Sequence, residues 1–392
     1  MKDNKKKLYF RRTIRTLCFF LAIIATCLVL QRYFLRNTDH NSLRIEGFYQ
    51  EDRDSLDAVL IGASDIYTSF IPGRAYDRCK LTSYLLASES ITAQGVKTAV
   101  KEVVRTQHPE CIIIEANAFL YGASDNESNQ AHIHKFFDNL PLSVNKLEFI
   151  QKKVPADERA EYFFPLMKYH GTWTEYPERF HLAASDIALQ ARGYNYLKGF
   201  RTTTDIYNSS KPGLNDSLSS VTEELDLNPD LEKELLDLLD YCKKRDLNVI
   251  FIRAPHFVTE KTLDRVKRSQ KMASFVRDFG YSYYTFENDV KKIGINENHD
   301  FYNEDHMNMY GALKFTDYVC DKLIQEEGIV PEPLNDTQRE IWENAAKSSN
   351  QLYRYCNDMM MRGEVRGAQE DVLTLTSLPN YSDAPIESKE GR

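Results

Sequence analysis

The stretch DAVLIG at residues 57–62 is a short apolar run that ends in glycine. A continuous apolar run of this length, closed by a turn residue, is typical of a strand that is buried on both faces of a parallel sheet. Because strands alternate with helices along the chain, we predict an α/β protein with a doubly wound parallel sheet. Three further strands are predicted at 111–115, 248–252 and 282–286, and helices over 93–106, 230–245, 260–279 and 310–325.

Length and charge limit the classes of protein to which the chain can belong. Its 392 residues suffice for one large domain or two small ones with a substantial core. The whole chain has a formal net charge of −8, and residues 1–36 hold nine basic residues and one acidic residue, which leaves −16 for the remainder. A nucleic-acid partner requires a basic surface, so the acidic body argues against one.

The N-terminal segment predicts attachment to a membrane. The run LCFFLAIIATCLVL at 17–30 is uncharged and almost entirely apolar, and a basic cluster precedes it. We expect a cytoplasmic basic tail at 1–12, a single transmembrane signal anchor at 13–35 and a linker at 36–56, with the main domain outside the cell membrane. A cleaved signal peptide is the alternative, although no small-residue cleavage site follows the run.

Two regions depart from the alternation of strands and helices. Residues 122–228 are rich in aromatic, histidine and proline residues, and we predict that they form a helical insertion within a main domain over 57–329. Residues 330–392 are predicted to be a polar C-terminal tail. Within that tail, 336–361 has the pattern of a helix and 378–392 has the composition of a disordered segment.

Neither the cysteines nor the histidines have the spacing of a metal site. The seven cysteines include no CxxC pair, and buried free thiols are the expected outcome. No metal and no cofactor are therefore predicted. The insertion contains four histidines without compact ligand spacing, at His132, His134, His170 and His181.

A serine directly follows the first predicted strand, in the sequence GASDIYTSFIP at 62–72. The carboxyl end of a parallel strand lies at the edge of the sheet where α/β proteins bind ligands. Gly62 permits a tight turn, and the backbone N–H groups after it can face a developing oxyanion. Ser64 is therefore a candidate nucleophile, with the role of a helix N-cap as the alternative.

A second polar loop, DFYNEDHMNMYG at 300–311, leads into the last predicted helix. A histidine in such a loop acts as a general base when an acid or an amide fixes the orientation of its ring. Asn303, three residues before His306, is placed to do so. His306 and Asn303 are therefore candidate catalytic residues, with an ordinary surface loop as the alternative.

A third polar group, Arg253 and His256, follows the strand predicted at 248–252. These side chains fall at the same edge of the sheet as Ser64. We expect them to make structural hydrogen bonds, and binding of a carboxylate or a phosphate is the alternative.

Taken together, the GxS turn near the start of the domain and the histidine loop near its end resemble the SGNH hydrolase superfamily. The chain is most similar to membrane-anchored members from Gram-positive bacteria, among them proteins that help to attach D-alanine to teichoic acids and relatives of surface-polysaccharide O-acetyltransferases. The resemblance implies an SGNH/flavodoxin-like doubly wound sheet over about 55–325. The other matching pieces are SYLLAS at 83–88, HPECIIIEAN at 108–117 and HMNMYGALKFTDY at 306–318.

The resemblance implies a role for each candidate. Ser64 would be the nucleophile and His306 the base, and the acid of the family falls at Asn303. An asparagine orients an imidazole but stabilises its cation less, and replacing the aspartate by asparagine in a serine protease lowers the rate about 10⁴-fold. Asp300 and Asp305 are alternatives for the missing acid.

The oxyanion donors implied by the resemblance also differ from the family pattern. The glycine of the family falls near Ser90, where this chain has serine or the following Ile91, and the asparagine corresponds to Asn117. These substitutions keep an inactive protein among the alternatives.

The leading functional hypothesis is a serine-dependent acyl or acetyl ester transferase, or an esterase, that acts on cell-envelope glycans outside the membrane. Its partners would be a cell-envelope polysaccharide or teichoic acid and a membrane-bound protein that donates the acyl group. One alternative is a catalytically inactive SGNH-like scaffold. Another is a glycan-binding surface protein that uses aromatic residues of the insertion, such as Trp173 and Tyr176.

Overall fold

The structure is a computed structural model that describes residues 2–34, 40–122, 129–169, 195–365 and 380–386. At its centre lies a sheet of five parallel strands in the order β2-β1-β3-β4-β5. The prediction of an α/β fold with a parallel sheet is confirmed. The strands are β1 (Ala58–Gly62), β2 (Ser83–Ala87), β3 (Cys111–Glu115), β4 (Val249–Arg253) and β5 (Ser282–Thr285).

The strand order reverses at β1. The chain moves from β1 outward to β2 and then crosses to the other side of β1 with β3, followed by β4 and β5. Ile61 of β1 accordingly pairs with Leu86 of β2 on one side and with Ile114 of β3 on the other. In a sheet of this kind, ligands bind in the crevice at the carboxyl ends of the strands where the order reverses. The residues after Gly62 and Glu115 stand at this crevice.

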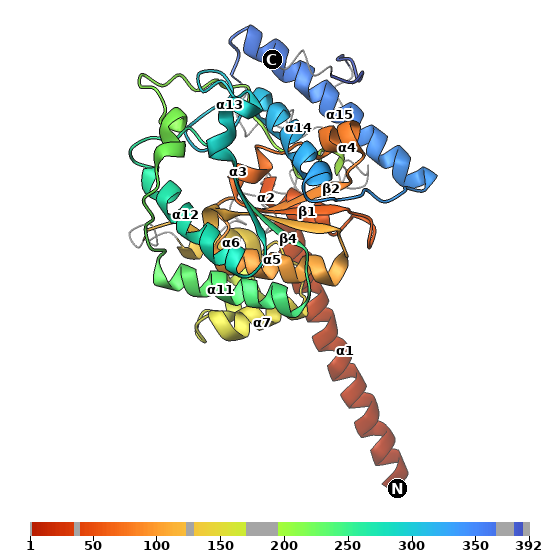
Figure 1. Cartoon of the computed structure of the whole chain (residues 1–392). Helices are drawn as coiled ribbons and strands as arrows, with labels where there is room; N and C mark the ends of the chain where they lie inside the picture. The colour runs from red at the N-terminus through yellow and green to blue at the C-terminus, as the bar shows by residue number, and fades with distance from the viewer. Residues whose placement is uncertain (1, 35–39, 123–128, 170–194, 366–379, 387–392) are drawn as a thin grey trace.

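Helices cover both faces of the sheet (Figure 1). In β1, Val59 and Ile61 belong to one apolar core and Ala58 and Leu60 to the other, as expected for residues that alternate between faces. Both cores exclude water from the strand, so all of β1 is buried. The first face carries α5 (Ala93–Thr106), α7 (Val144–Lys153), α11 (Pro229–Lys244) and α12 (Leu263–Asp278), and the second α4 (Pro72–Cys79), α14 (Met309–Gln325) and α15 (Asp336–Met361).

Of the segment predicted as an insertion, the described residues 129–169 form short helices that begin with α6 (Asn129–Phe137), whereas 198–214 and 221–228 have no regular secondary structure. Phe137 stacks on Phe149 with 3.5 Å between ring centroids, which holds α6 and α7 together. Trp173, Tyr176, His170 and His181 lie outside the described residues. The shorter elements of the body are α2 (His40–Phe48), α3 (Ser64–Tyr67), α6 (Asn129–Phe137), α8 (Arg159–Phe163), α9 (Leu166–Tyr169), α13 (Val290–Ile293) and the 3-10 helices η1 (Ala116–Phe119), η4 (Asn195–Leu197), η5 (Asn215–Ser220) and η6 (Phe286–Asp289).

Helix α1 (Lys2–Phe34) projects from the body as a long rod (Figure 1). Among the described residues, none of the helices combines the length and the apolar character that a membrane crossing requires. The transmembrane anchor predicted at 13–35 is therefore not supported. The apolar run at 17–30 is shorter than the ~20 residues of a full span, and charged residues flank it.

The segment predicted as a linker at 36–56 differs from expectation, because its described part contains a buried helix. In α2, Ile45 and Phe48 are part of the first core. The guanidinium of Arg44 donates to the carbonyl of Gly199 at 2.7 Å, and the hydroxyl of Tyr84 in β2 donates to the carbonyl of Arg44 at 2.9 Å. These contacts attach α2 to the edge strand of the sheet.

The segment predicted as a polar tail, 330–392, also contributes to the core. The helix predicted over 336–361 is confirmed as α15, which lies along α4 (Figure 1). Its apolar side, including Trp342 and Cys356, is buried. Further along, the carbonyl of Ile386 accepts a hydrogen bond of 2.9 Å from the guanidinium of Arg74 in α4. The described part of this segment is therefore packed against the domain.

Substituting Gly73 by alanine is expected to destabilise the protein by about 1–3 kcal/mol, the cost of overpacking a well-packed core. A methyl group at Gly73 in α4 would clash with the backbone carbonyl of Ala345 and the hydroxyl of Ser349 in α15. The measurement is the free energy of unfolding in urea. Gly213→Ala is the control, since its methyl would meet the movable carboxylate of Glu297. An equal stability for Gly73→Ala and the wild type would contradict this account of how α15 packs.

Candidate functional site

Ser64 lies at the carboxyl end of β1, the position predicted from the sequence. β1 ends at Gly62, and Ser64 begins the short helix α3. A Cβ at Gly62 would come within 2.7 Å of the Cβ of Glu115, so only glycine allows β1 and β3 to approach this closely. The half-buried Ser64 therefore stands directly at the point where the strand order reverses.

His306 lies in the loop before α14, and Asn303 fixes the orientation of its ring. The Oδ1 atom of Asn303 is 2.8 Å from Nδ1 of His306 and also accepts the backbone N–H of Asp305 at 3.0 Å. Because the N–H of Asp305 can only donate, the atom of Asn303 that faces the ring is the oxygen. Nδ1 of His306 must then carry the proton, which leaves a lone pair on Nε2.

The Nε2 atom of His306 is buried and makes no hydrogen bond in the described part of the structure. Tyr302 stacks on the ring, with 5.2 Å between centroids and 6° between planes. Burial lowers the pKa of His306 below its ordinary value, so the ring is neutral at neutral pH. A neutral imidazole with an unused basic nitrogen is the form that a general base requires.

The side chains of His306 and Ser64 make no hydrogen bond with each other. The pairing of these two residues stays a prediction. Nor does the structure bring Asp300 or Asp305 to the ring nitrogen. The carboxylate of Asp300 is 2.8 Å from the ammonium of Lys314, and that of Asp305 is 3.2 Å from the guanidinium of Arg265. Asn303 is therefore the residue that orients the imidazole.

Of the two predicted oxyanion donors, Ser90 stands beside the end of β1. The N–H of Ser88 donates to the carbonyl of Gly62 at 3.2 Å, which fixes the loop against the strand. Ser90 has a φ of +50°, a left-handed conformation that glycine adopts without strain and other residues adopt rarely. The backbone of Ser90 therefore has a conformation that suits glycine, the residue that the SGNH resemblance implies near this position.

The second predicted donor, Asn117, uses its side-chain amide within the protein. Its Nδ2 donates to Asp65 at 2.5 Å and to the hydroxyl of Tyr121 at 3.4 Å, and its Oδ1 accepts from Arg253 at 2.8 Å. Both amide hydrogens are thus engaged. In this arrangement Asn117 organises the buried charges beneath Ser64.

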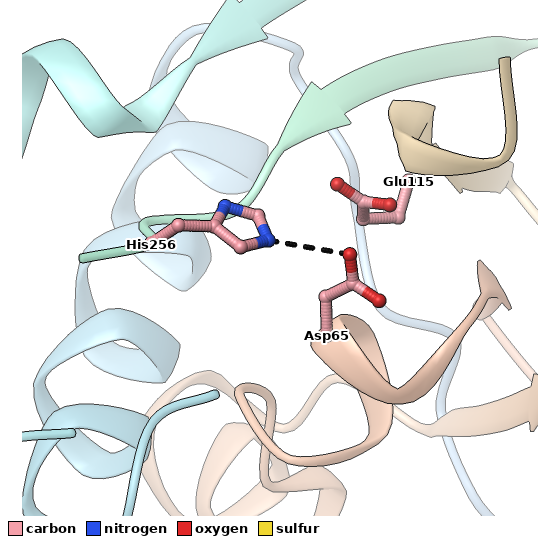
Figure 2. Close-up of side chains that lie close together, drawn as sticks. All are labelled: Asp65, Glu115 and His256. Carbon is pink, nitrogen blue, oxygen red and sulfur yellow. Dashed lines mark hydrogen bonds and ion pairs between the residues drawn. The ribbon is translucent and has the colours of Figure 1, made fainter. Parts of the chain in front are cut away.

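Those charges form a network, and only Arg253 and His256 of it were predicted from the sequence. Arg253 lies 3.5 Å from Glu115 and 3.2 Å from Glu287, and His256 lies 2.8 Å from Glu287 and 3.2 Å from Asp65. All five side chains are almost completely buried. Figure 2 shows His256 from the loop after β4 reaching Asp65 at the start of α3, with Glu115 beside them. The expectation of structural hydrogen bonds for Arg253 and His256 agrees with these contacts.

The protonation states balance the charge of this network. Burial disfavours the carboxylate of Asp65, but the hydrogen bond and positive charge of His256 outweigh it and hold the pKa of Asp65 below its ordinary value. Burial likewise opposes the charge of His256, but its hydrogen bonds to Asp65 and Glu287 raise its pKa to about 9. Burial raises the pKa of Glu115 to about 8. At neutral pH two positive groups, Arg253 and His256, therefore face two carboxylates.

Asp65, Glu115 and His256 each place one donor atom within 4.8 Å of the others, which is a spacing that a metal ion can use. The guanidinium of Arg253 already supplies a positive charge next to Glu115, and both ring nitrogens of His256 are engaged by carboxylates. A divalent cation would have to displace a proton and sit beside a fixed cation. The chemistry of the group therefore fits a compensated ion network better than a metal centre.

A pocket of about 350 Å³ adjoins the site, between the start of α5, η1, α6 and the start of α11. Ser90 and Tyr121 connect it to the residues described above, because Tyr121 accepts from Asn117. Its volume lies in the range of small-molecule sites, about 300–1,000 Å³. The wall mixes polar and apolar side chains: Ser90, Ile91, Thr92, Ala93, Gln94, Ala118, Tyr121, His132, Ile133, Asp230, Leu231, Lys233 and Glu234.

Comparison of the chain with protein-family models and with curated proteins gives no match. The resemblance to SGNH hydrolases therefore stays a prediction from the motifs around Ser64 and His306. What supports a function is the geometry of the described residues.

Proposed function

We propose that the protein transfers or hydrolyses an acyl or acetyl ester on a cell-envelope glycan, with Ser64 as nucleophile and His306 as base. The observation that carries this proposal is the state of His306. Asn303 fixes its tautomer, burial keeps it neutral, and its Nε2 has no other hydrogen-bond partner among the described residues. The imidazole and Ser64 both lie at the carboxyl edge of the parallel sheet. An imidazole held in this way fits nucleophilic catalysis.

In the proposed reaction, Oγ of Ser64 attacks the ester carbonyl while Nε2 of His306 takes the hydroxyl proton. The alkoxide of the substrate leaves with that proton, and an acyl-serine remains. Water or a sugar hydroxyl then attacks the acyl-serine and gives its proton to Nε2, which passes that proton to Oγ of Ser64 as the acyl product leaves. The negative charge of Asp65 favours the imidazolium that forms in each half of the cycle, which offsets part of the loss due to Asn303.

The pocket beside Ser90 is the proposed site of the alcohol part of the ester. The charges on its wall nearly balance, because Glu234 is ion-paired with Lys153 and the carboxylate of Asp230 is accompanied by the ammonium of Lys233. Local charge therefore favours a neutral, hydroxyl-rich group over an anion. Ser90 and Thr92 provide hydroxyls for such a ligand, and the apolar side chains of the wall provide a surface for the carbon face of a sugar.

The proposed location is the outer surface of the cell membrane. Along α1 the apolar side chains are exposed, for example Leu17 by 59% and Phe19 by 63%, which is costly for a helix in water. Attachment to a membrane through α1 would cover them. The proposed partners are a cell-envelope polysaccharide or teichoic acid and a membrane-bound donor of the acyl group.

Labelling with a fluorophosphonate is expected to modify Ser64, because such a probe reacts with a serine only when a neighbouring base activates it. The measurement is the mass of the labelled peptide from the intact chain, and the expected result is loss of label in Ser64→Ala. Ser69→Ala is the matched control, since its hydroxyl lies in the same segment and is bonded to the carbonyl of Asp65. Equal labelling of Ser64→Ala and the wild type would refute the proposed nucleophile.

A catalytically inactive scaffold is the second candidate, and two observations favour it. The side chains of Ser64 and His306 make no hydrogen bond, and the residue beside Nδ1 is an amide where the family has an acid. A wild-type chain that folds but takes up no fluorophosphonate would support the scaffold. The same experiment therefore separates the two functions.

A further inference from the structure

Two ion pairs clamp helix α4 to helix α14. The guanidinium of Arg74 contacts Asp317 at 2.7 and 2.9 Å, and that of Arg78 contacts Asp321 at 2.7 and 2.8 Å. Both members of the second pair follow those of the first by one helical turn, so the two helices run side by side in the same direction (Figure 1). Their mutual position is therefore well defined at this point.

Cys79 and Cys320 lie at the second of these clamps, each adjacent in sequence to one of its partners. The thiol of Cys79 donates to the carbonyl of Ala75 at 3.3 Å. Cys320 belongs to the second apolar core and Cys79 packs against that core, where each thiol is the largest influence on the pKa of the other. Two thiols that each adjoin one partner of the same bidentate ion pair and pack in the same core are in the position from which a disulfide can form. In the structure both thiols are free.

The two thiols differ in access and in acidity. Cys79 is half-buried and Cys320 is fully buried. The hydrogen bond from Cys320, the N–H of Leu81 and the charge of Arg78 lower the pKa of the Cys79 thiol despite its burial. The contact with Cys79 and burial raise the pKa of Cys320.

We propose that Cys79 and Cys320 are a reactive thiol and its resolving partner, and that they form a reversible disulfide by exchange with a small-molecule disulfide such as oxidised glutathione. The thiolate of Cys79 attacks one sulfur of that disulfide, forms a mixed disulfide and releases one thiolate. The sulfur of Cys320 then loses its proton and attacks the Cys79 sulfur. The intramolecular bond forms, the second small thiol leaves, and the small disulfide has been reduced by two electrons.

The bond would join the helix that follows the Ser64 segment to the helix that follows the His306 loop. It closes a loop of the chain that contains the whole sheet except β1, and a cross-link over so long a loop restricts the unfolded chain strongly. The oxidised protein is therefore expected to melt about 5 °C or more above the reduced one. This proposal does not depend on the ester chemistry proposed for Ser64.

The test uses the full chain treated with oxidised glutathione and then with iodoacetamide, followed by proteolysis without reductant and mass spectrometry. A linked pair of peptides that contains Cys79 and Cys320 is expected, and dithiothreitol should remove it. Cys18, which is exposed on α1, is an internal reference, because an accessible thiol without a neighbour keeps its glutathione. Glutathione that stays on Cys79 of the wild type, or an absence of reaction at both cysteines, would overturn the proposal.

Two variants test the order of the steps. In Cys320→Ser the mixed disulfide at Cys79 should accumulate, and in Cys79→Ser no glutathione should reach Cys320. Cys356→Ser, which changes a buried cysteine of α15, is the matched control and should keep the cross-link. Circular dichroism checks that each variant is folded. Modification of Cys320 in folded Cys79→Ser would refute the assigned roles, and the peptide measurement on the wild type stands whether or not the variants fold.

Discussion

Replacement of His306 by alanine is expected to lower the rate of ester turnover by about 10²–10⁴-fold, the contribution of a positioned general base. The Nε2 atom of this ring has no other hydrogen-bond partner among the described residues, so its loss leaves no buried group of the protein unpaired there. Asn303 keeps the hydrogen bond from Asp305. The rate should therefore fall while the fold remains. The measurement is hydrolysis of 4-nitrophenyl acetate by the full chain, with urea unfolding as the check on stability.

A control in the same loop makes this experiment sharper. His299 stacks on Tyr310 and contacts Asp300, and it is 44% exposed at the side chain. His299→Ala should leave the rate within a few-fold of the wild type. In the wild type the rate should fall with decreasing pH only below the lowered pKa of His306, because the protonated ring cannot accept a proton. A rate unchanged in His306→Ala would eliminate this residue as the base.

Replacement of Arg253 by methionine is expected to destabilise the protein by about 3–5 kcal/mol. Arg253 is 1% exposed and faces the carboxyl groups of Glu115 and Glu287. Without the guanidinium, the negative charge of Glu287 remains buried with His256 as its principal compensation. The free energy of unfolding in urea measures this loss, and the expected change is a lower midpoint with an unaltered slope.

The matched control is Arg78→Met, which also removes a guanidinium from a carboxylate, that of Asp321. The side chain of Arg78 is 31% exposed and that of its partner Asp321 46%, so water can solvate the carboxylate that is left. That variant should lose about 1 kcal/mol or less. Adding Glu287→Gln to Arg253→Met should restore part of the stability, because it removes the uncompensated charge. Equal losses for Arg253→Met and Arg78→Met would contradict the role given to burial.

The sheet was largely predictable because buried parallel strands leave an apolar record in the sequence. β1, β3, β4 and β5 were each found from such runs or from their position between helices. β2 was not assigned, since its apolar part, Tyr84 to Ala87, is short and bounded by serines. Its edge is covered by remote segments that no local pattern reveals: the N–H of Leu85 donates to the carbonyl of Lys198 at 3.1 Å.

The burial of helices α2 and α15 also depends on remote segments that no local sequence pattern reveals. Both are polar in overall composition and were read as a linker and a tail. Their burial depends on narrow apolar stripes, such as Ile45 and Phe48 in α2, that match surfaces formed by segments far away in the chain. Composition averaged over such a helix hides the stripe.

The candidate site was predictable in its outline. The positions of Ser64, His306 and Asn303 followed from strand ends and spacing. Asp65, Glu115 and Glu287 were missed as partners, although each follows or ends an apolar run and so marks a charge at the edge of the sheet. Which of these charges meet depends on the strand order and on the route of the loops, and one sequence contains no direct signal of either.

The packing of α15 along α4 has a consequence for biosynthesis. During synthesis the strands β1 and β2 and the helix α4 leave the ribosome early, but α15, which covers α4, begins only at residue 336, 264 residues after the start of α4 at residue 72. Until then the apolar side of α4 stays open to water and to other chains. Folding of the domain is therefore expected to finish only after translation has passed residue 361, and a chaperone that shields this face in the interval would raise the yield.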